Sequence, residues 1–144
     1  MVWLLFLHIC SLVIWAASLC ILLLLISRVA SVGLHIPSKG DSLERLWFTR
    51  LASPAGLMTI VSGTAVFALD GNLNSWLLLK LTLVTCLVIC HVAAGLLILY
   101  GSRPKVSGVA GKCTVLLSFI LLLLLSIIVL VLLKPEQEAL LWFL

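Results

Sequence analysis

Four long apolar stretches, separated by short polar segments, account for most of the chain. They cover residues 2–26, 48–69, 76–100 and 113–133, and a helix needs roughly 20 residues to cross a hydrocarbon core of about 30 Å. The stretches are continuously apolar, whereas the strands of a membrane barrel alternate between apolar and polar positions. The pattern therefore predicts an all-α integral membrane protein, a four-transmembrane-helix bundle that forms one domain over residues 1–144.

Composition agrees with lipid as the solvent. Hydrophobic residues make up 64% of the chain and charged residues 10%, whereas only about half of a soluble domain is apolar. The cysteines lie inside or at the edge of apolar stretches, where a free thiol behaves as a small hydrophobic group. Cys86 and Cys90 share a helix face, but no second pair at ligand spacing joins them. We therefore expect no disulfide framework, and any chemistry must lie among the helices or at their ends.

Lys and Arg are concentrated in two of the connections. The first connection contains Arg28, Lys39, Arg45 and Arg50, the third contains Arg103, Lys105 and Lys112, and only Lys134 follows the fourth stretch. The positive-inside rule predicts that the first and third connections are cytoplasmic. We accordingly expect the turn at residues 70–75 and both termini to lie on the periplasmic side of the inner (plasma) membrane, an N-out/C-out topology. The net charge of +4 marks the inner membrane face and requires no nucleic-acid partner.

The second stretch carries local signals near its start. Asp41 and Ser42 predict the N-terminus of a helix that enters the membrane a few residues later. Pro54, several residues inside the span, is expected to kink the helix or to free a carbonyl group. Small residues then follow on one side at helical spacing, which suits close packing against a neighbouring helix. These residues are Gly56, Thr59 and Gly63.

Ionisable side chains within apolar stretches are costly to insert and are functional candidates by default. His8, Lys80 and His91 meet this description. Lys80 lies about five residues into the third stretch, roughly 8 Å deep, and His8 lies at a similar depth in the first, so we expect both in one outer layer. His91 shares the helix face of Lys80 about 16 Å further along, in an inner layer near Arg50.

A semi-polar stripe runs along the first stretch. His8, Ser11, Trp15 and Ser18 follow one another at steps of three and four residues, which places them on one face of a helix. Because polar groups avoid lipid, this stripe should face the bundle interior. Trp15 is too deep for an interfacial aromatic belt and belongs either to packing or to the wall of a cofactor site.

Haem fits such an interior. Haem is a flat apolar macrocycle, its iron binds imidazole, and its carboxylates attract cations, so it matches the residues of the two layers. The space between the helices of a bundle can hold such a group. His8 is the candidate iron ligand, and Lys80, His91 and Trp15 are further candidate cofactor-binding residues. Simpler roles stay open: a histidine that packs through hydrogen bonds, a Lys80 side chain that reaches the interface, and Arg50 as an anchor.

Four groups of residues occur in order along the chain. Residues 7–19 read L-H-I-x-x-x-V-x-W-x-A-x-L, and residues 50–63 read R-x-x-x-P-x-x-x-x-T-x-x-x-G. Residues 76–84 read W-L-x-x-K-L-x-L-V, with His91 eleven positions after the lysine, and residues 131–135 read V-L-L-K-P. In this combination and spacing the chain resembles the HemJ-type protoporphyrinogen IX oxidases and their CopD-like relatives.

The resemblance implies a small bundle that binds haem b, with His8 and Lys80 at the positions most associated with haem binding and activity. It also implies oxidation of protoporphyrinogen IX to protoporphyrin IX, a step of porphyrin biosynthesis, with electrons passing through the haem to a membrane acceptor such as quinone. On this basis Lys80 and Arg50 are the candidate catalytic residues of an oxidoreductase, and His8 is the candidate metal ligand.

Two other functions stay open. The first is a non-catalytic accessory subunit of a larger membrane redox or copper enzyme, favoured by the Leu-rich fourth stretch and by departures from the family pattern. The family's L-P-R stretch, its following tyrosine and histidine, and its histidine before the lysine correspond here to Leu22-Leu23-Leu24, Arg28-Val29 and Leu78. The second is CopD-like copper transport. A copper path prefers soft thioether ligands, which are scarce here because Met1 and Met58 are the only methionines in the chain. Expected partners are the lipid bilayer, haem or a porphyrin, and either a second copy of the chain or other membrane subunits.

Overall fold

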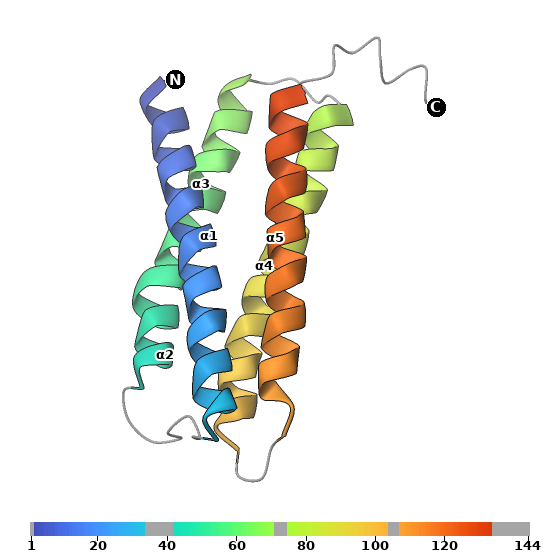
Figure 1. Ribbon diagram of the computed structural model, residues 1–144. Coiled ribbons are helices and arrows are strands. Elements are labelled where there is room, and N and C mark those ends of the chain that lie inside the picture. Colours follow the sequence, from blue (N-terminus) through green and yellow to red (C-terminus); the bar gives the residue numbers. More distant parts are fainter. Residues whose placement is uncertain (1, 34–41, 71–74, 104–106, 134–144) are drawn as a thin grey trace.

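The computed structural model describes residues 2–33, 42–70, 75–103 and 107–133, and all its regular elements are helical (Figure 1). They are α1 (Val2–Ser31), α2 (Leu43–Trp47), the π-helical turn η1 (Phe48–Ala52), α3 (Ser53–Asp70), α4 (Ser75–Gly101) and α5 (Val109–Leu133). The segments α2, η1 and α3 follow one another without a break, so the described chain forms four rods.

Each rod contains a helix that is long and apolar enough to cross a membrane. These candidate spans are Val2–Ser31, Leu43–Leu69, Leu78–Gly101 and Val109–Leu132. The predicted all-helical class and the presence of four helices able to span a membrane are thus confirmed within the described residues. The helices extend beyond the predicted apolar stretches, because α1 ends at Ser31 rather than at residue 26 and α5 begins at Val109 rather than at residue 113. Gly33 and Gly108, both with positive φ, lie just outside these two helix ends.

Helix α1 is the central element of the bundle. It packs extensively against α3 and α5, and it also contacts η1 and α4. In Figure 1 the blue α1 runs beside α3 on one flank and α5 on the other, and α4 lies against α5. The predicted interior stripe of α1 is confirmed, since Ser11, Trp15 and Ser18 are buried and His8 is half-buried.

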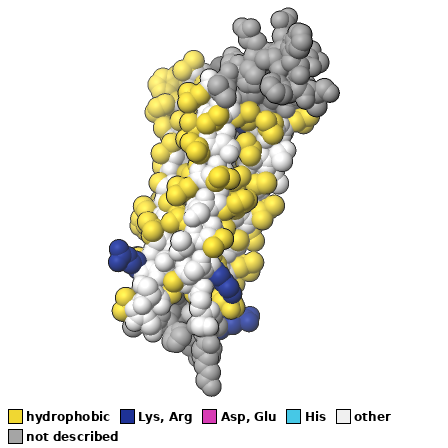
Figure 2. Space-filling view, turned by 45° about the vertical axis from the view of Figure 1, so that its right-hand side comes forward, with side chains coloured by type: hydrophobic (Ala, Val, Ile, Leu, Met, Phe, Trp, Pro, Cys, Tyr) yellow, Lys and Arg dark blue, Asp and Glu magenta, His cyan; other side chains and the backbone are white. Residues whose placement is uncertain are grey.

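The outer surface of the bundle is largely apolar. Figure 2 shows hydrophobic side chains over most of the visible face and Lys and Arg gathered toward its lower part. The C-terminal ends of α1 and α4 and the N-terminal ends of α2 and α5 lie at the lower end in Figure 1. The described basic residues close to these helix ends are Arg28, Arg45, Arg50, Arg103 and Lys112. Lys39, Lys105 and Lys134, and the predicted turn residues 71–74, lie outside the described residues.

The junction between α2 and α3 is built around Pro54. Proline lacks the N–H that would bond a carbonyl one turn earlier. Directly before it the backbone forms η1, in which the Ser53 N–H donates to the carbonyl oxygen of Phe48, five residues back. The Ser53 hydroxyl donates to the same oxygen at 2.9 Å. The expected disturbance at Pro54 is therefore a widened turn, a type of irregularity that is frequent at functional sites.

The predicted start of the second helical rod is confirmed at Ser42. Its side chain accepts a hydrogen bond from the backbone N–H of Arg45 at 3.4 Å, which satisfies one of the N–H groups that a helix start leaves open. Asp41 lies outside the described residues. A few residues later Trp47 donates its indole N–H to the carbonyl oxygen of Ser18 at 3.2 Å, and this bond attaches α2 to α1.

Candidate functional site

The outer polar layer is centred on His8 of α1. Its Nδ1 lies 3.0 Å from the carbonyl oxygen of Thr59 and 3.2 Å from the hydroxyl oxygen of Ser62, both on α3. A carbonyl oxygen only accepts hydrogen bonds, so Nδ1 must carry the proton of the neutral ring. The Ser62 hydroxyl donates to the carbonyl oxygen of Met58 at 2.6 Å and so accepts from His8 as well. The nitrogen with the lone pair is therefore Nε2.

Gly63 makes this position of the imidazole possible. A Cβ atom added at Gly63 would lie 2.9 Å from Cε1 of His8 and 3.3 Å from Nδ1, and the first distance is shorter than real side chains allow. The predicted small-residue face of the second span is thereby confirmed, because Gly63 and the buried Thr59 both face the ring of His8. The ring is held against the α3 backbone and its direction is fixed.

Lys80 belongs to the same layer. It is half-buried on α4, and its charge is close enough to act electrostatically on the His8 imidazole. Two ionisable groups from distant parts of the sequence thus share one region of the bundle, as the depth argument predicted. A cation beside a neutral imidazole favours an anionic group between or near them.

The inner polar layer is centred on His91 of α4. The indole N–H of Trp15 donates to Nδ1 of His91 at 3.2 Å, so this nitrogen has the lone pair. The other nitrogen, Nε2, then carries the proton and lies 3.4 Å from the hydroxyl oxygen of Ser53, a long hydrogen bond. Phe48 stacks on the imidazole with 4.6 Å between ring centroids and 20° between planes. In this arrangement both nitrogens of His91 are engaged within the bundle.

Two further glycines hold the aromatic rings of the inner layer. A Cβ atom at Gly56 would lie 2.9 Å from Nε1 of the fully buried Trp15, and one at Gly95 would lie 2.8 Å from Cζ of Phe48. The first approach brings α1 against α3, and the second brings η1 against α4. The rings of Trp15 and Phe48 thus contact His91 and bring α1, η1 and α4 together around one imidazole.

The structure brings some of the predicted residues together and separates others. His8 and Lys80 share the outer layer, and Trp15 and His91 form a hydrogen-bonded pair. Arg50 is exposed on η1 and is not among the described contacts of His91. Its place beside that ring is taken by Phe48, which the sequence analysis did not single out.

The other unpredicted members are Ser53, Ser62 and the main-chain oxygen of Thr59. Ser53 could have been considered from its position directly before Pro54, since a serine hydroxyl within a helix often donates to a carbonyl oxygen about one turn earlier. Ser62 lies on the same helix face as Thr59 but has no distinctive motif. A main-chain acceptor leaves no signal in the sequence at all.

Among the described residues there is no group of three or more His, Cys, Asp or Glu that could hold a metal ion. A haem iron needs less from the protein, because the macrocycle supplies its equatorial ligands and one axial imidazole can hold it. His8 offers such a nitrogen in Nε2. Comparison with models of known protein families, with curated proteins and with solved structures gave no match. The function must therefore be argued from the chemistry of these two layers.

Proposed function

We propose that the protein is a haem-b-binding, HemJ-like membrane protein in which Nε2 of His8 binds the iron. The observation that supports this most directly is the hydrogen bond from Nδ1 of His8 to the Thr59 carbonyl oxygen at 3.0 Å. A metal-ligating histidine usually donates its second ring N–H to a carbonyl or carboxylate, which fixes the tautomer and strengthens the ligand. His8 has this arrangement, with the ring locked against Gly63.

Lys80 supplies the second element of the proposed site. As an ammonium it would pair with a haem propionate, and as a neutral amine it would bind the iron, which requires loss of its proton. The first role suits a half-buried lysine at modest depth, because its charge then meets an anion near the membrane surface. Bound haem would give the bundle a one-electron carrier.

Oxidation of protoporphyrinogen IX to protoporphyrin IX, with the electrons passed to a membrane acceptor such as a quinone, is the activity that we assign to this site. Lys80 is the catalytic candidate that lies beside the proposed cofactor. Arg50 lies in the half of the bundle that contains His91, on the order of 16 Å from Lys80 along the helix axis. In this proposal Arg50 acts on an anionic group at that end of the bundle rather than on the reacting centre.

We further propose the topology. The exposed basic residues near the α1–α2 and α4–α5 connections are assigned to the cytoplasmic face of the inner (plasma) membrane. The layer that contains His8 and Lys80 then lies toward the periplasmic side, as do both termini. Reaction of single-cysteine variants, for example at Ser31 and at Ser102, with a membrane-impermeant thiol reagent tests this assignment, because in intact cells both positions should be protected.

The test of haem binding is a reduced-minus-oxidised optical spectrum of the protein purified from haem-replete cells in mild detergent. We expect the Soret and α bands of a b-type haem, their loss in His8→Ala, and their partial return when free imidazole is added to that variant. Cys10→Ser is a matched control, because it changes a half-buried side chain close to His8 in the same helix without touching the proposed ligand.

A colourless preparation that is folded by circular dichroism contradicts the proposal. If such a preparation copurifies with other membrane proteins at fixed stoichiometry, the accessory-subunit function replaces it. A preparation that contains haem but has no oxidase activity would support haem binding and contradict the proposed catalysis. The activity itself is tested by growth of a strain that lacks its protoporphyrinogen oxidase, with Lys80→Gln as the variant that should not restore growth.

A further inference from the structure

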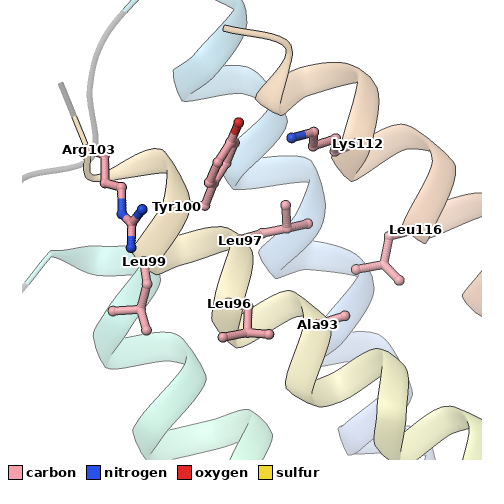
Figure 3. A pocket seen from close by; sticks show the side chains of 8 residues that line it. All are labelled: Ala93, Leu96, Leu97, Leu99, Tyr100, Arg103, Lys112 and Leu116. Carbon is pink, nitrogen blue, oxygen red and sulfur yellow. The ribbon is translucent and has the colours of Figure 1, made fainter. Parts of the chain in front are cut away.

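A groove between α4 and α5 begins at Ala93, two residues after His91, and extends toward the end of α4. Its volume is about 500 Å³, within the range of about 300 to 1,000 Å³ typical of ligand sites. One part of its lining is apolar and includes Leu96, Leu97 and Leu116, and the other part consists of Tyr100, Arg103 and Lys112 (Figure 3). The groove therefore joins a hydrocarbon-like wall to a positively charged end.

Tyr100 links the two cations at that end. The Lys112 ammonium lies 4.0 Å from the centroid of the Tyr100 ring, a cation–π contact. In Figure 3 the ring lies between Lys112 and Arg103. Both cations are exposed, and no acidic residue lines the described groove. Two positive charges thus flank one aromatic ring, and the lining supplies no opposite charge.

The position of Lys112 increases the positive potential. It belongs to the first turn of α5, which begins at Val109 and is 25 residues long. The unbonded N–H groups of a long helix give its N-terminus a partial positive charge that favours anions. Arg103 lies two residues after the end of α4, so the charged part of the groove lies where the candidate spans Leu78–Gly101 and Val109–Leu132 end and begin.

A second hollow adjoins the groove. Its volume is about 540 Å³, and it shares Lys112 and Leu116 with the first while extending to Val115 and Phe119 on α5. Gly111 opens this hollow, since a Cβ atom added there would meet nothing within 4 Å. Two mainly apolar hollows therefore share the side chains of Lys112 and Leu116.

We propose that this surface binds an anionic phospholipid from the membrane. The phosphate lies at the hydroxyl end of Tyr100, accepts a hydrogen bond from that hydroxyl, and is attracted by the Lys112 and Arg103 cations on the two sides of the ring. One acyl chain follows the leucines of the groove and the other lies over Gly111 toward Phe119. From Ala93 to Arg103 the groove extends about 15 Å along α4, a length that suits a molecule with a charged head and an apolar tail. A free phosphate ion would leave the apolar wall unused.

The experiment measures lipid binding to the full chain purified in a non-ionic detergent, by native mass spectrometry. The probes are phosphatidylglycerol, phosphatidylcholine and inorganic phosphate. We expect phosphatidylglycerol to bind more tightly than phosphatidylcholine, and inorganic phosphate not to compete. In Arg103→Gln/Lys112→Gln the affinity for phosphatidylglycerol should fall roughly 30-fold, because each basic residue near a membrane surface contributes about fivefold.

Three variants distinguish this site from general electrostatic attraction. Arg28→Gln/Arg45→Gln removes two exposed charges near the same end of the bundle and should leave binding unchanged. Arg103→Lys/Lys112→Arg keeps both charges and should keep most of the affinity. Gly111→Leu fills the second hollow without changing charge and should weaken binding several-fold. Equal binding of the two phospholipids, or an equal loss in the Arg28/Arg45 control, overturns the proposal, and so does competition by inorganic phosphate.

Discussion

Trp15 of α1 and His91 of α4 are joined by a hydrogen bond of 3.2 Å in which the indole N–H donates to Nδ1 of the imidazole. The two residues are 76 positions apart in the chain. Trp15 is only 1% exposed, so water cannot replace this bond. The pair fixes the tautomer of His91 and thereby makes Nε2 the donor to Ser53.

Trp15→Phe should destabilise the bundle, because it leaves the acceptor nitrogen of His91 without its partner. Hydrogen bonds between membrane helices average about 0.6 kcal/mol and reach about 1.7 kcal/mol, so we expect a loss of about 1 kcal/mol in the free energy of unfolding. Equilibrium unfolding in mixed micelles measures it. Trp3→Phe is the control, since Trp3 is 85% exposed, and an equal effect of the two substitutions would refute the assigned role.

Gly56→Ala should be more harmful than an alanine elsewhere. The new methyl group would lie 2.9 Å from the Trp15 indole, which is buried and cannot move aside without losing its bond to His91. Overpacking of this kind costs about 1 to 3 kcal/mol. Gly111→Ala is the matched control, because its methyl group enters open space and alanine favours a helix over glycine by up to about 1 kcal/mol. In the same unfolding assay, Gly56→Ala should lower the free energy of unfolding and Gly111→Ala should raise it.

Pro54→Ala should couple energetically to Phe48. Restoring the missing N–H allows η1 to return to a regular α-helix, which changes the register of Phe48 relative to His91. In the native chain we expect Phe48→Leu to cost about 0.5 to 1.5 kcal/mol from the lost ring stacking. In the Pro54→Ala background this cost should largely vanish. A double-mutant cycle on unfolding free energies gives the coupling, and additive effects would show that the π-helical turn does not position the ring.

Ser62→Ala tests the support of the proposed haem ligand. The hydroxyl oxygen lies 3.2 Å from Nδ1 of His8, and it and the Thr59 carbonyl oxygen both accept from the Nδ1–H group. Loss of a partner that orients a ligating histidine commonly reduces affinity by about 10- to 100-fold, and because the carbonyl remains we expect the lower figure. Haem titration followed at the Soret band measures this. Ser126→Ala is the control, since that hydroxyl bonds only within its own helix; a parallel loss there would mean a nonspecific effect.

Much of the arrangement follows from helical periodicity. The steps of three and four between His8, Ser11, Trp15 and Ser18 correctly predicted the interior face of α1. The small-residue face of the second span could also be predicted, because glycines at helical spacing in a membrane helix usually allow close packing against a neighbouring helix. The positions of His8 and Lys80 within their apolar stretches were enough to predict that they share one layer, although no motif links the two residues.

The inner layer was harder to predict because it depends on a departure from periodicity. A π-helical turn takes up one extra residue, so residues before it are rotated relative to those after it. Phe48, and not Arg50, consequently faces His91. The partner of His8 is a main-chain oxygen, which any residue at position 59 would supply. Neither fact can be obtained from a helical wheel.

The central position of α1 has a consequence for the order of assembly. This helix is synthesised before α3, α4 and α5, which supply the surfaces that bury its semi-polar stripe. Its serines need no partner in the meantime, since Ser11 and Ser18 donate to carbonyl oxygens of α1 itself, at 3.0 and 2.8 Å. His8 and Trp15 depend on groups that are translated later. The hydrogen bond of Trp15 can therefore form only after the third span, which carries His91, has been synthesised, and the bundle cannot reach its final packing before that point.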